Sequence, residues 1–202
     1  MLQLDHLAVS GASLAAAQAH VETVLHTHMQ PGGEHDIFHT HNTLLGLKDD
    51  LYLEAIATNP DAPTPGRPRW FDLDRFDGAP RLTNWICRTD DIEAAAARFS
   101  EAGVPVALRR GDMKWRMAVP ASGILPFDNL FPALIQWDVP VRPPERLDAR
   151  DIRLKTLTIH HPWVDALKSM LAPVLSDPRV DFESGPAQLS AEFETPSGLC
   201  KL

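Results

Sequence analysis

The segment from His35 to Ala57 concentrates side chains that can bind metals or move protons. His35, His39 and His41 fall within seven residues, and a lone glutamate, Glu54, follows them in the run YLEAIA. Because His39 and His41 are separated by one residue, a strand would turn both imidazoles to the same side. Two interpretations stay open from these residues alone: a metal or ligand site, or a polar rim on an ordinary sheet.

Composition narrows the partners of such a site. The chain of 202 residues has 27 acidic and 19 basic residues and a formal net charge of −8, which disfavours nucleic acid and anionic membranes. The amino-terminal run MLQLDHLAVSG contains no basic leader, and no apolar stretch is long enough to span a bilayer. We therefore expect a cytoplasmic protein that acts on a small molecule, with Cys87 and Cys200 as reduced thiols.

The elements that must position these residues repeat along the chain. Residues 1–60 predict a strand (LQLDHLAVS), a helix capped by Ser13, and two or three strands, of which THNTLLGL and LYLEAIA are the clearest. After a Pro-rich crossover, residues 80–140 repeat the order strand, helix, strand, strand, strand, with a helix capped by Asp90 or Asp91. A duplicated βαβββ unit is therefore expected, because two such copies commonly pack about a pseudo-twofold axis and build a site between them.

A second Pro-rich link precedes a third, shorter unit at residues 150–202, with the predicted order βαββ. The predicted fold class is therefore α+β: tandem βαβββ modules within residues 1–140 and an appended C-terminal partial module. We expect His26, His28 and His35, which fall at a helix end and in a loop, to be solvated.

Four motifs in this order resemble the glyoxalase-like branch of the vicinal oxygen chelate superfamily, which includes glyoxalase I, bleomycin-resistance proteins and extradiol dioxygenases. They are LDHLAV, THNTLLGL, YLEAIA and GILPFDNLFPALIQW. The resemblance covers residues 1 to about 140 well and implies sheets curled into a cup that holds a divalent metal. It also implies one ligand from the first strand and one from the last strand of each module, which gives His6 and Glu54 in the first module.

The corresponding positions of the second module fall at or near Trp85 and Gln136, and neither side chain is a strong metal ligand. Zinc, iron, manganese or nickel would then be bound by His6, His41 and Glu54, with a position left open for substrate. Glu54 is the predicted catalytic residue. The residues predicted to contact substrate are His39, Asn42, Trp85, Trp115, Arg116 and Gln136.

Two functions follow from this resemblance. One is a glyoxalase-like lyase, isomerase or dioxygenase acting on an oxygen-chelating substrate. The other is a metal-free protein of the bleomycin-resistance type that sequesters a small molecule without chemistry. Members of the superfamily pair their modules either within one chain or between the two chains of a homodimer, and the sequence leaves both arrangements open.

Overall fold

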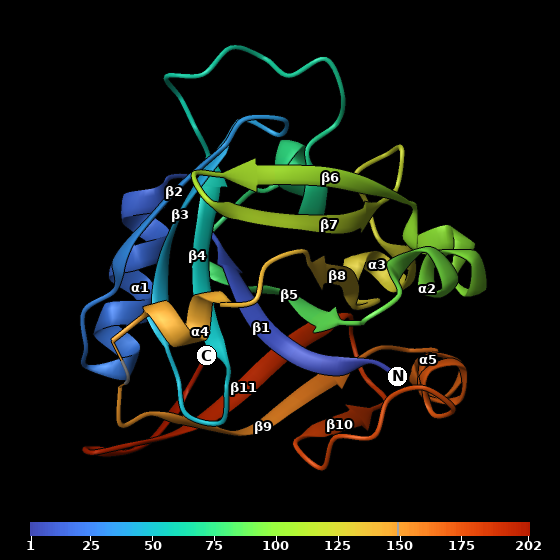
Figure 1. The fold of residues 1–202 in the computed structure, drawn as a ribbon. Coiled ribbons are helices and arrows are strands. Elements are labelled where there is room, and N and C mark those ends of the chain that lie inside the picture. Colours follow the sequence, from blue (N-terminus) through green and yellow to red (C-terminus); the bar gives the residue numbers. More distant parts are fainter. Residues whose placement is uncertain (149) are drawn as a thin grey trace.

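Alternating apolar residues in eight strands build one strongly curled sheet, which dominates the computed structural model of residues 1–148 and 150–202 (Figure 1). The first module supplies β1 (Gln3–Ser10), α1 (Leu14–Leu25), β2 (Gln30–His35), β3 (Thr40–Gly46) and β4 (Tyr52–Thr58). The second supplies β5 (Arg81–Arg88), α2 (Ile92–Arg98), β6 (Val104–Arg110), β7 (Met113–Val119) and β8 (Ala133–Trp137). The predicted tandem βαβββ arrangement is confirmed.

The strand order β2-β3-β4-β1-β5-β8-β7-β6 shows how the modules join. β1 and β5 pair antiparallel at the centre, and each has the last strand of its own module as a parallel neighbour on its other side. The two modules therefore pair within one chain. Their common concave face is the cup, and the opposite face is called the outer face below.

The local signals for the helices were correctly placed. The Ser13 hydroxyl accepts from the Ala16 N–H at 3.2 Å at the start of α1, and the Asp91 carboxylate accepts from the Ala94 N–H at 3.0 Å at the start of α2. β2 was missed, because its sequence QPGGEH contains proline and two glycines. Such residues are tolerated at this position because β2 is an edge strand.

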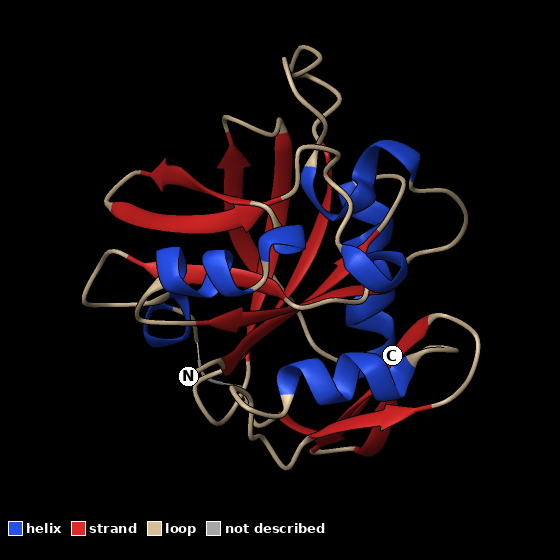
Figure 2. Ribbon diagram, turned by 90° about the vertical axis from the view of Figure 1, so that its right-hand side faces the viewer, coloured by secondary structure: helices blue, strands red, loops and turns tan. Residues whose placement is uncertain are grey.

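The third module forms a separate sheet, ordered β10-β9-β11-β12, that lies below the large sheet (Figures 1 and 2). Its elements are β9 (Arg153–His160), α5 (Val164–Leu171), β10 (Val180–Glu183), β11 (Gln188–Thr195) and β12 (Gly198–Lys201). Short helices occur in the connections: η1 (Trp70–Arg75), η2 (Ser100–Ala102), α3 (Pro126–Asn129) and α4 (Pro143–Arg146). Phe182 of β10 packs edge-on against Trp85 of β5, with ring centroids 6.5 Å apart, so the third module covers part of the outer face.

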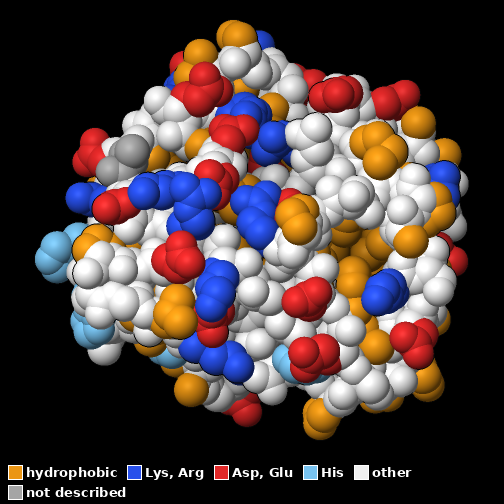
Figure 3. All heavy atoms as spheres, turned by 90° about the horizontal axis from the view of Figure 1, so that it is seen from below, with side chains coloured by type: hydrophobic (Ala, Val, Ile, Leu, Met, Phe, Trp, Pro, Cys, Tyr) orange, Lys and Arg blue, Asp and Glu red, His pale blue; other side chains and the backbone are white. Residues whose placement is uncertain are grey.

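Basic and acidic side chains are interspersed on the face seen from below (Figure 3). Ion pairs such as Lys155 with Glu192, at 2.6 Å, occur in the third module. This mixing gives that face no patch of a single sign for a phosphate backbone. None of the helices in the described part of the chain is long and apolar enough to cross a membrane.

Candidate functional site

Three neighbouring strands of the first module direct polar side chains into the cup. In the parallel pairing of β1 with β4, His6 lies opposite Tyr52 and Ala8 lies opposite Glu54, so these residues share one face. Asn42 of β3 joins them on that face. His6, Asn42, Tyr52 and Glu54 line a cavity of about 30 Å³, which is room for about one water molecule.

A β-bulge adds a second carboxylate to this group. The register of β1 against β5 shifts between Leu4 and His6, and Asp5 is the extra residue. A regular strand would turn Asp5 away from His6, whereas the bulge brings the Asp5 Oδ1 to 2.7 Å from the His6 Nδ1. The other ring nitrogen, Nε2, lies 3.8 Å from the Glu54 Oε2. Asp5, His6 and Glu54 thus form a buried carboxylate–imidazole–carboxylate line.

Asp5 is fully buried, and its charge is compensated from three sides. Its Oδ2 accepts from the Trp137 indole N–H at 3.1 Å. The guanidinium groups of Arg88 and Arg142 lie 3.7 and 3.6 Å from the same oxygen. With Oδ1 bonded to Nδ1, the Nε2 of His6 is the ring nitrogen that faces Glu54.

Glu54 is held by an amide that also contacts a cation. The Asn42 Nδ2 donates to the Glu54 Oε1 at 2.5 Å, so Oε2 is the oxygen directed toward His6. The Asn42 Oδ1 accepts from the Gly33 N–H at 2.9 Å and from the Arg110 Nη1 at 3.1 Å. Arg110 lines the cavity, and no acidic side chain among the described residues forms an ion pair with it.

Two further ionisable side chains in the cup are uncharged at neutral pH. Burial, aided by the positive charge of Arg110, lowers the pKa of His35 to about 3. His35 packs edge-on to Trp70 and shares a hydrogen bond between its Nδ1 and the Thr40 hydroxyl at 2.9 Å. Burial and the nearby carboxylates of Asp5 and Glu54 raise the pKa of Tyr52 well above 10, and its ring stacks on His6 at 4.2 Å.

The second module contributes an apolar wall to the cup. Trp115 and Met117 of β7 and Ile135 and Trp137 of β8 line the cavity opposite the polar group. The remaining cover comes from connecting segments: Trp70 and Phe71 of η1 and Pro143 of α4. The first module therefore provides most of the ionisable groups, and the second provides the apolar surroundings.

Four of the residues predicted for the site line this cavity: His6, Asn42, Glu54 and Trp115. His39 and His41 do not share a face, because β3 begins only at Thr40 and His39 lies in the preceding turn, at φ 51°. The His39 Nδ1 is bonded to the Pro63 carbonyl. His41 alternates with Asn42 and lines a hollow on the α1 side of the sheet, so it does not join His6 and Glu54.

Trp85, Arg116 and Gln136 lie on the outer face, away from the cavity. Trp85 pairs with Leu7 rather than His6 across β1 and β5, and its indole donates to the Leu130 carbonyl at 2.8 Å. Arg116 binds the Asp138 carboxylate through two hydrogen bonds of 3.0 Å. The Gln136 Oε1 accepts from the first N–H of α2, at Ile92 and 2.9 Å, and so caps that helix.

Sequence reasoning missed three residues that the structure places at the site: Asp5, His35 and Tyr52. His35, expected to be solvated, is buried because β2 extends the sheet through it. Tyr52 could have been found, since it is two residues before Glu54 on one strand and must share its face. Asp5 could not, because nothing in the alternation of β1 marks the bulge.

The donor set does not fit a resident divalent metal ion. His6 Nε2 and Glu54 Oε2 face each other, but the described residues contain no group of three His, Cys, Asp or Glu side chains that could hold a metal. Catalytic zinc sites use three protein ligands. The second module lines the cavity with Arg110, Met113, Trp115, Met117, Ile135 and Trp137, none of which is a strong metal ligand.

The paired modules and their continuous curled sheet define a protein of the vicinal oxygen chelate superfamily. Residues 4–175 match the family model described as a glyoxalase-like domain, and the chain belongs to this family. The match runs through the second Pro-rich link and into the third module.

Solved structures with this fold have low sequence identity to the chain. A hypothetical protein from Staphylococcus aureus is 15% identical with a TM-score of 0.64, over 93% of this chain and 88% of that one. Methylmalonyl-CoA epimerase from Streptomyces coelicolor, in complex with 2-nitronate-propionyl-CoA, is 12% identical with a TM-score of 0.46, over 68% of this chain and 98% of that one. Methylmalonyl-CoA epimerase from Mycobacterium tuberculosis is 20% identical with a TM-score of 0.39, over 66% of this chain and 85% of that one. Comparison with curated proteins gives no match.

Proposed function

We propose that this protein is a glyoxalase-like lyase or isomerase that transfers a proton on a small, oxygen-bearing substrate without a resident metal. The observation that carries the proposal is the buried line of Asp5, His6 and Glu54, with its free imidazole nitrogen 3.8 Å from a carboxylate oxygen. A base and an acid at hydrogen-bonding range of one small volume can remove a proton from one position and return it at another.

Glu54 is the proposed base. Asn42 binds one carboxylate oxygen, so the other, Oε2, is free to take a proton from a carbon next to a carbonyl group. The C–H bond breaks, its proton moves to Glu54, and its electron pair forms an enolate whose negative charge lies on the carbonyl oxygen. Glu54 then returns the proton to carbon, or passes it to the His6 Nε2, which returns it. Asp5 acts as a positioning residue, because it fixes the orientation of His6 and stabilises the positive charge on the ring.

Arg110 defines the substrate class. Its guanidinium group lies at the cavity and is bonded to the Asn42 amide oxygen, with no carboxylate partner among the described residues. A carboxylate or developing enolate oxygen is the group it would bind best. The apolar wall of the second module favours a small hydrocarbon part, so we infer a small 2-oxo or 2-hydroxy acid or a related carbonyl compound.

The cavity of about 30 Å³ must enlarge to admit such a molecule. Part of the cavity wall belongs to connecting segments rather than to strands: Trp70, Phe71 and Pro143. These segments are therefore expected to move when the cavity opens. Trp70 is 3% exposed, and its buried indole N–H has no hydrogen-bond partner in the described part of the chain. That donor would be satisfied by an oxygen of the substrate.

The test is solvent exchange. The protein is incubated in heavy water with a panel of small 2-oxo and 2-hydroxy acids. Loss of the proton on the carbon next to the carbonyl group (called the α-proton here, on C3 of a 2-oxo acid and on C2 of a 2-hydroxy acid) is followed by NMR. Replacement of Glu54 by Gln should slow the exchange by about 100-fold or more while preserving the hydrogen bond to Asn42. The matched control is Glu34→Gln, since Glu34 is an exposed glutamate of the same module. Exchange in E54Q at the wild-type rate would contradict the proposal.

Sequestration without chemistry is the second candidate, and the apolar half of the cup favours it. In that case a compound binds, E54Q leaves its dissociation constant nearly unchanged, and no α-proton exchanges. A metal-dependent reaction is tested separately by elemental analysis of protein prepared without an affinity tag. We expect well under one equivalent of metal, because among the described residues the cup brings together two metal-ligating side chains, His6 and Glu54. One equivalent that disappears in the variants His6→Ala and Glu54→Ala would show that a metal completes the site.

A further inference from the structure

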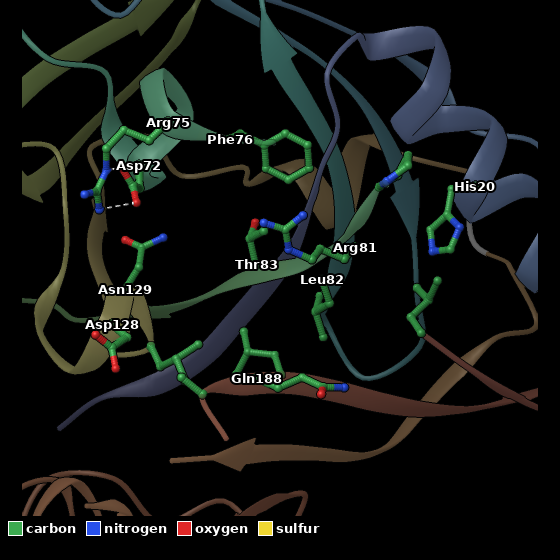
Figure 4. Close-up of a pocket in the computed structure, with 15 residues that line it drawn as sticks. His20, Asp72, Arg75, Phe76, Arg81, Leu82, Thr83, Asp128, Asn129 and Gln188 are labelled. Atoms are coloured by element: carbon green, nitrogen blue, oxygen red, sulfur yellow. Dashed lines mark hydrogen bonds and ion pairs between the residues drawn. The ribbon is translucent and has the colours of Figure 1, made fainter. Parts of the chain in front are cut away.

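A pocket of about 550 Å³ lies on the other side of the η1 turn from the cup (Figure 4). It is bounded by α1, η1, the start of β5, α3 and the third module. This volume is within the range of small-molecule sites, about 300–1,000 Å³, whereas the cup holds about one water molecule. Phe71 lines the cup and the next residue, Asp72, lines this larger pocket, so a single turn forms part of both walls.

Two left-handed turns build one side of the pocket. Phe71 and Asp72 have φ of 59° and 58°, and Phe127, Asp128 and Asn129 have φ of 55°, 53° and 71°. Non-glycine residues adopt this conformation at an energetic cost, which is commonly found at ligand sites. The turns are tied together, because the Asn129 Nδ2 donates to the Phe71 carbonyl at 3.1 Å. The chain therefore holds a strained wall in place at this pocket.

The acidic side chains on this wall already have partners. The carboxylate of Asp72 binds the Arg75 guanidinium through two hydrogen bonds of 2.7 Å. Asp128 accepts from the buried His161 at 3.1 Å. The Asp72–Arg75 pair largely cancels, and the hydrogen bond from His161 engages one oxygen of the Asp128 carboxylate.

Arg81 is the cation of the pocket that has no acidic partner among the described residues. Its guanidinium carbon lies 4.4 Å from the centre of the Phe76 ring, and its Nη1 donates to the Asp77 and Ala79 carbonyls at 2.7 and 3.2 Å. These contacts fix the group in position. Figure 4 shows Arg81 between Phe76 and Gln188, extending over the pocket. A fixed guanidinium with free N–H donors is a ready partner for a carboxylate, sulfonate or phosphate.

The floor beneath Arg81 is apolar. Leu82, Leu130 and Leu189 are buried and line it, and Leu202 adds a half-buried side chain. His20 and Gln188 lie at the rim, and neither side chain has a hydrogen-bond partner within the described residues. The pocket thus combines one fixed cation, two free polar groups and an apolar base.

We propose that this pocket binds an amphipathic organic anion, with its acidic group on Arg81 and its apolar body on the leucine floor. His20 and Gln188 would complete the contacts to the acidic group. The site is separate from the proton-transfer site in the cup, since none of His6, Glu54 and Arg110 lines it.

Fluorescence of anilinonaphthalene sulfonate, an aromatic sulfonate, tests this proposal, with octanoate as competitor. The wild-type protein should bind one equivalent saturably, and octanoate should displace it. Arg81→Gln should raise the dissociation constant about tenfold or more, because a charge-assisted hydrogen bond is lost. Gln188→Trp, at an exposed lining position, should obstruct part of the pocket and weaken binding without affecting folding.

The matched control is Arg98→Gln. Arg98 is an exposed arginine over a phenylalanine ring, 5.5 Å from the centre of Phe99, and it lines a different hollow. This variant and E54Q should bind both probes as the wild type does. Absence of binding to the wild type, equal binding by R81Q and wild type, or full binding by Q188W would each overturn the proposal. The binding of these probes and the α-proton exchange at Glu54 are measured separately, so either proposal can fail without the other.

Discussion

The replacement of Asp5 by asparagine tests the buried line of charges most directly. An amide has the shape of the carboxylate but presents one oxygen and one NH₂ group where Asp5 accepts hydrogen bonds with both oxygens. If the amide oxygen accepts from His6, its NH₂ group faces the Trp137 N–H; if the amide is reversed, the NH₂ group faces the His6 N–H. The first orientation leaves a buried donor without a partner, and the second requires His6 to change tautomer, so that its Nδ1 accepts and its Nε2 carries the proton.

The expected cost combines this donor clash, or the change of tautomer that avoids it, with the loss of charge beside Arg88 and Arg142. One buried unsatisfied group costs about 1–3 kcal/mol, and breaking a fully buried ion pair costs about 3–5 kcal/mol. Both arginines are 20–23% exposed at their side chains and keep Asp50 as a partner, so the charge contribution must be discounted. We expect a loss of about 3 kcal/mol, which lowers the melting temperature by roughly 6–12 °C for a chain of this size.

Urea unfolding followed by circular dichroism measures this difference. Asp50→Asn is the matched control, because Asp50 is 41% exposed and belongs to the same arginine cluster. Its loss should cost at most about 1 kcal/mol. A D5N protein as stable as the wild type, or no less stable than D50N, would show that Asp5 does not hold His6 in the way inferred here.

Three further predictions use the ionisable groups around the cup. Burial lowers the pKa of His35 to about 3. As the pH falls below 6.5, the unfolded chain binds a proton at this imidazole while the folded protein does not, so the free energy of unfolding should decrease. The NMR signal of His35 in the folded protein should not titrate near pH 7. Tyr52 is the single tyrosine of the chain, and its pKa is raised well above 10. Phenolate absorbance should therefore be absent from the folded protein at pH 10 and appear on unfolding. The free energy of unfolding should decrease above pH 10, because the tyrosine of the unfolded chain ionises there. Cys87 is buried and Cys200 is half-buried, so a disulfide-exchange reagent should titrate one thiol in the folded protein and two in denaturant; rapid modification of both in the folded state would contradict the assigned burial of Cys87.

The sequence predicted the fold well because the repeated unit depends on local sequence patterns. Helix caps at Ser13 and Asp91, alternation in the strands and prolines in the links each act over a few residues. The site was predicted less well because it depends on pairing between distant strands. Family motifs indicated His6 and Glu54, and both line the cavity. The bulge at Asp5, the start of β3 after His39 and the outward direction of Trp85 are set by register.

The division of the cup between the modules follows from these registers. In the first module, β1, β3 and β4 turn His6, Asn42 and Glu54 inward. In the second module, Arg116 and Gln136 face outward, where they bind Asp138 and cap α2, and Trp115 and Trp137 take the inward positions. Charged groups facing an apolar wall interact in a medium of low polarity, which strengthens the interaction among Asp5, His6 and Glu54. The apolar side chains of the second module therefore enclose His6 and Glu54 on one side, which is the setting that the proposed proton transfer requires.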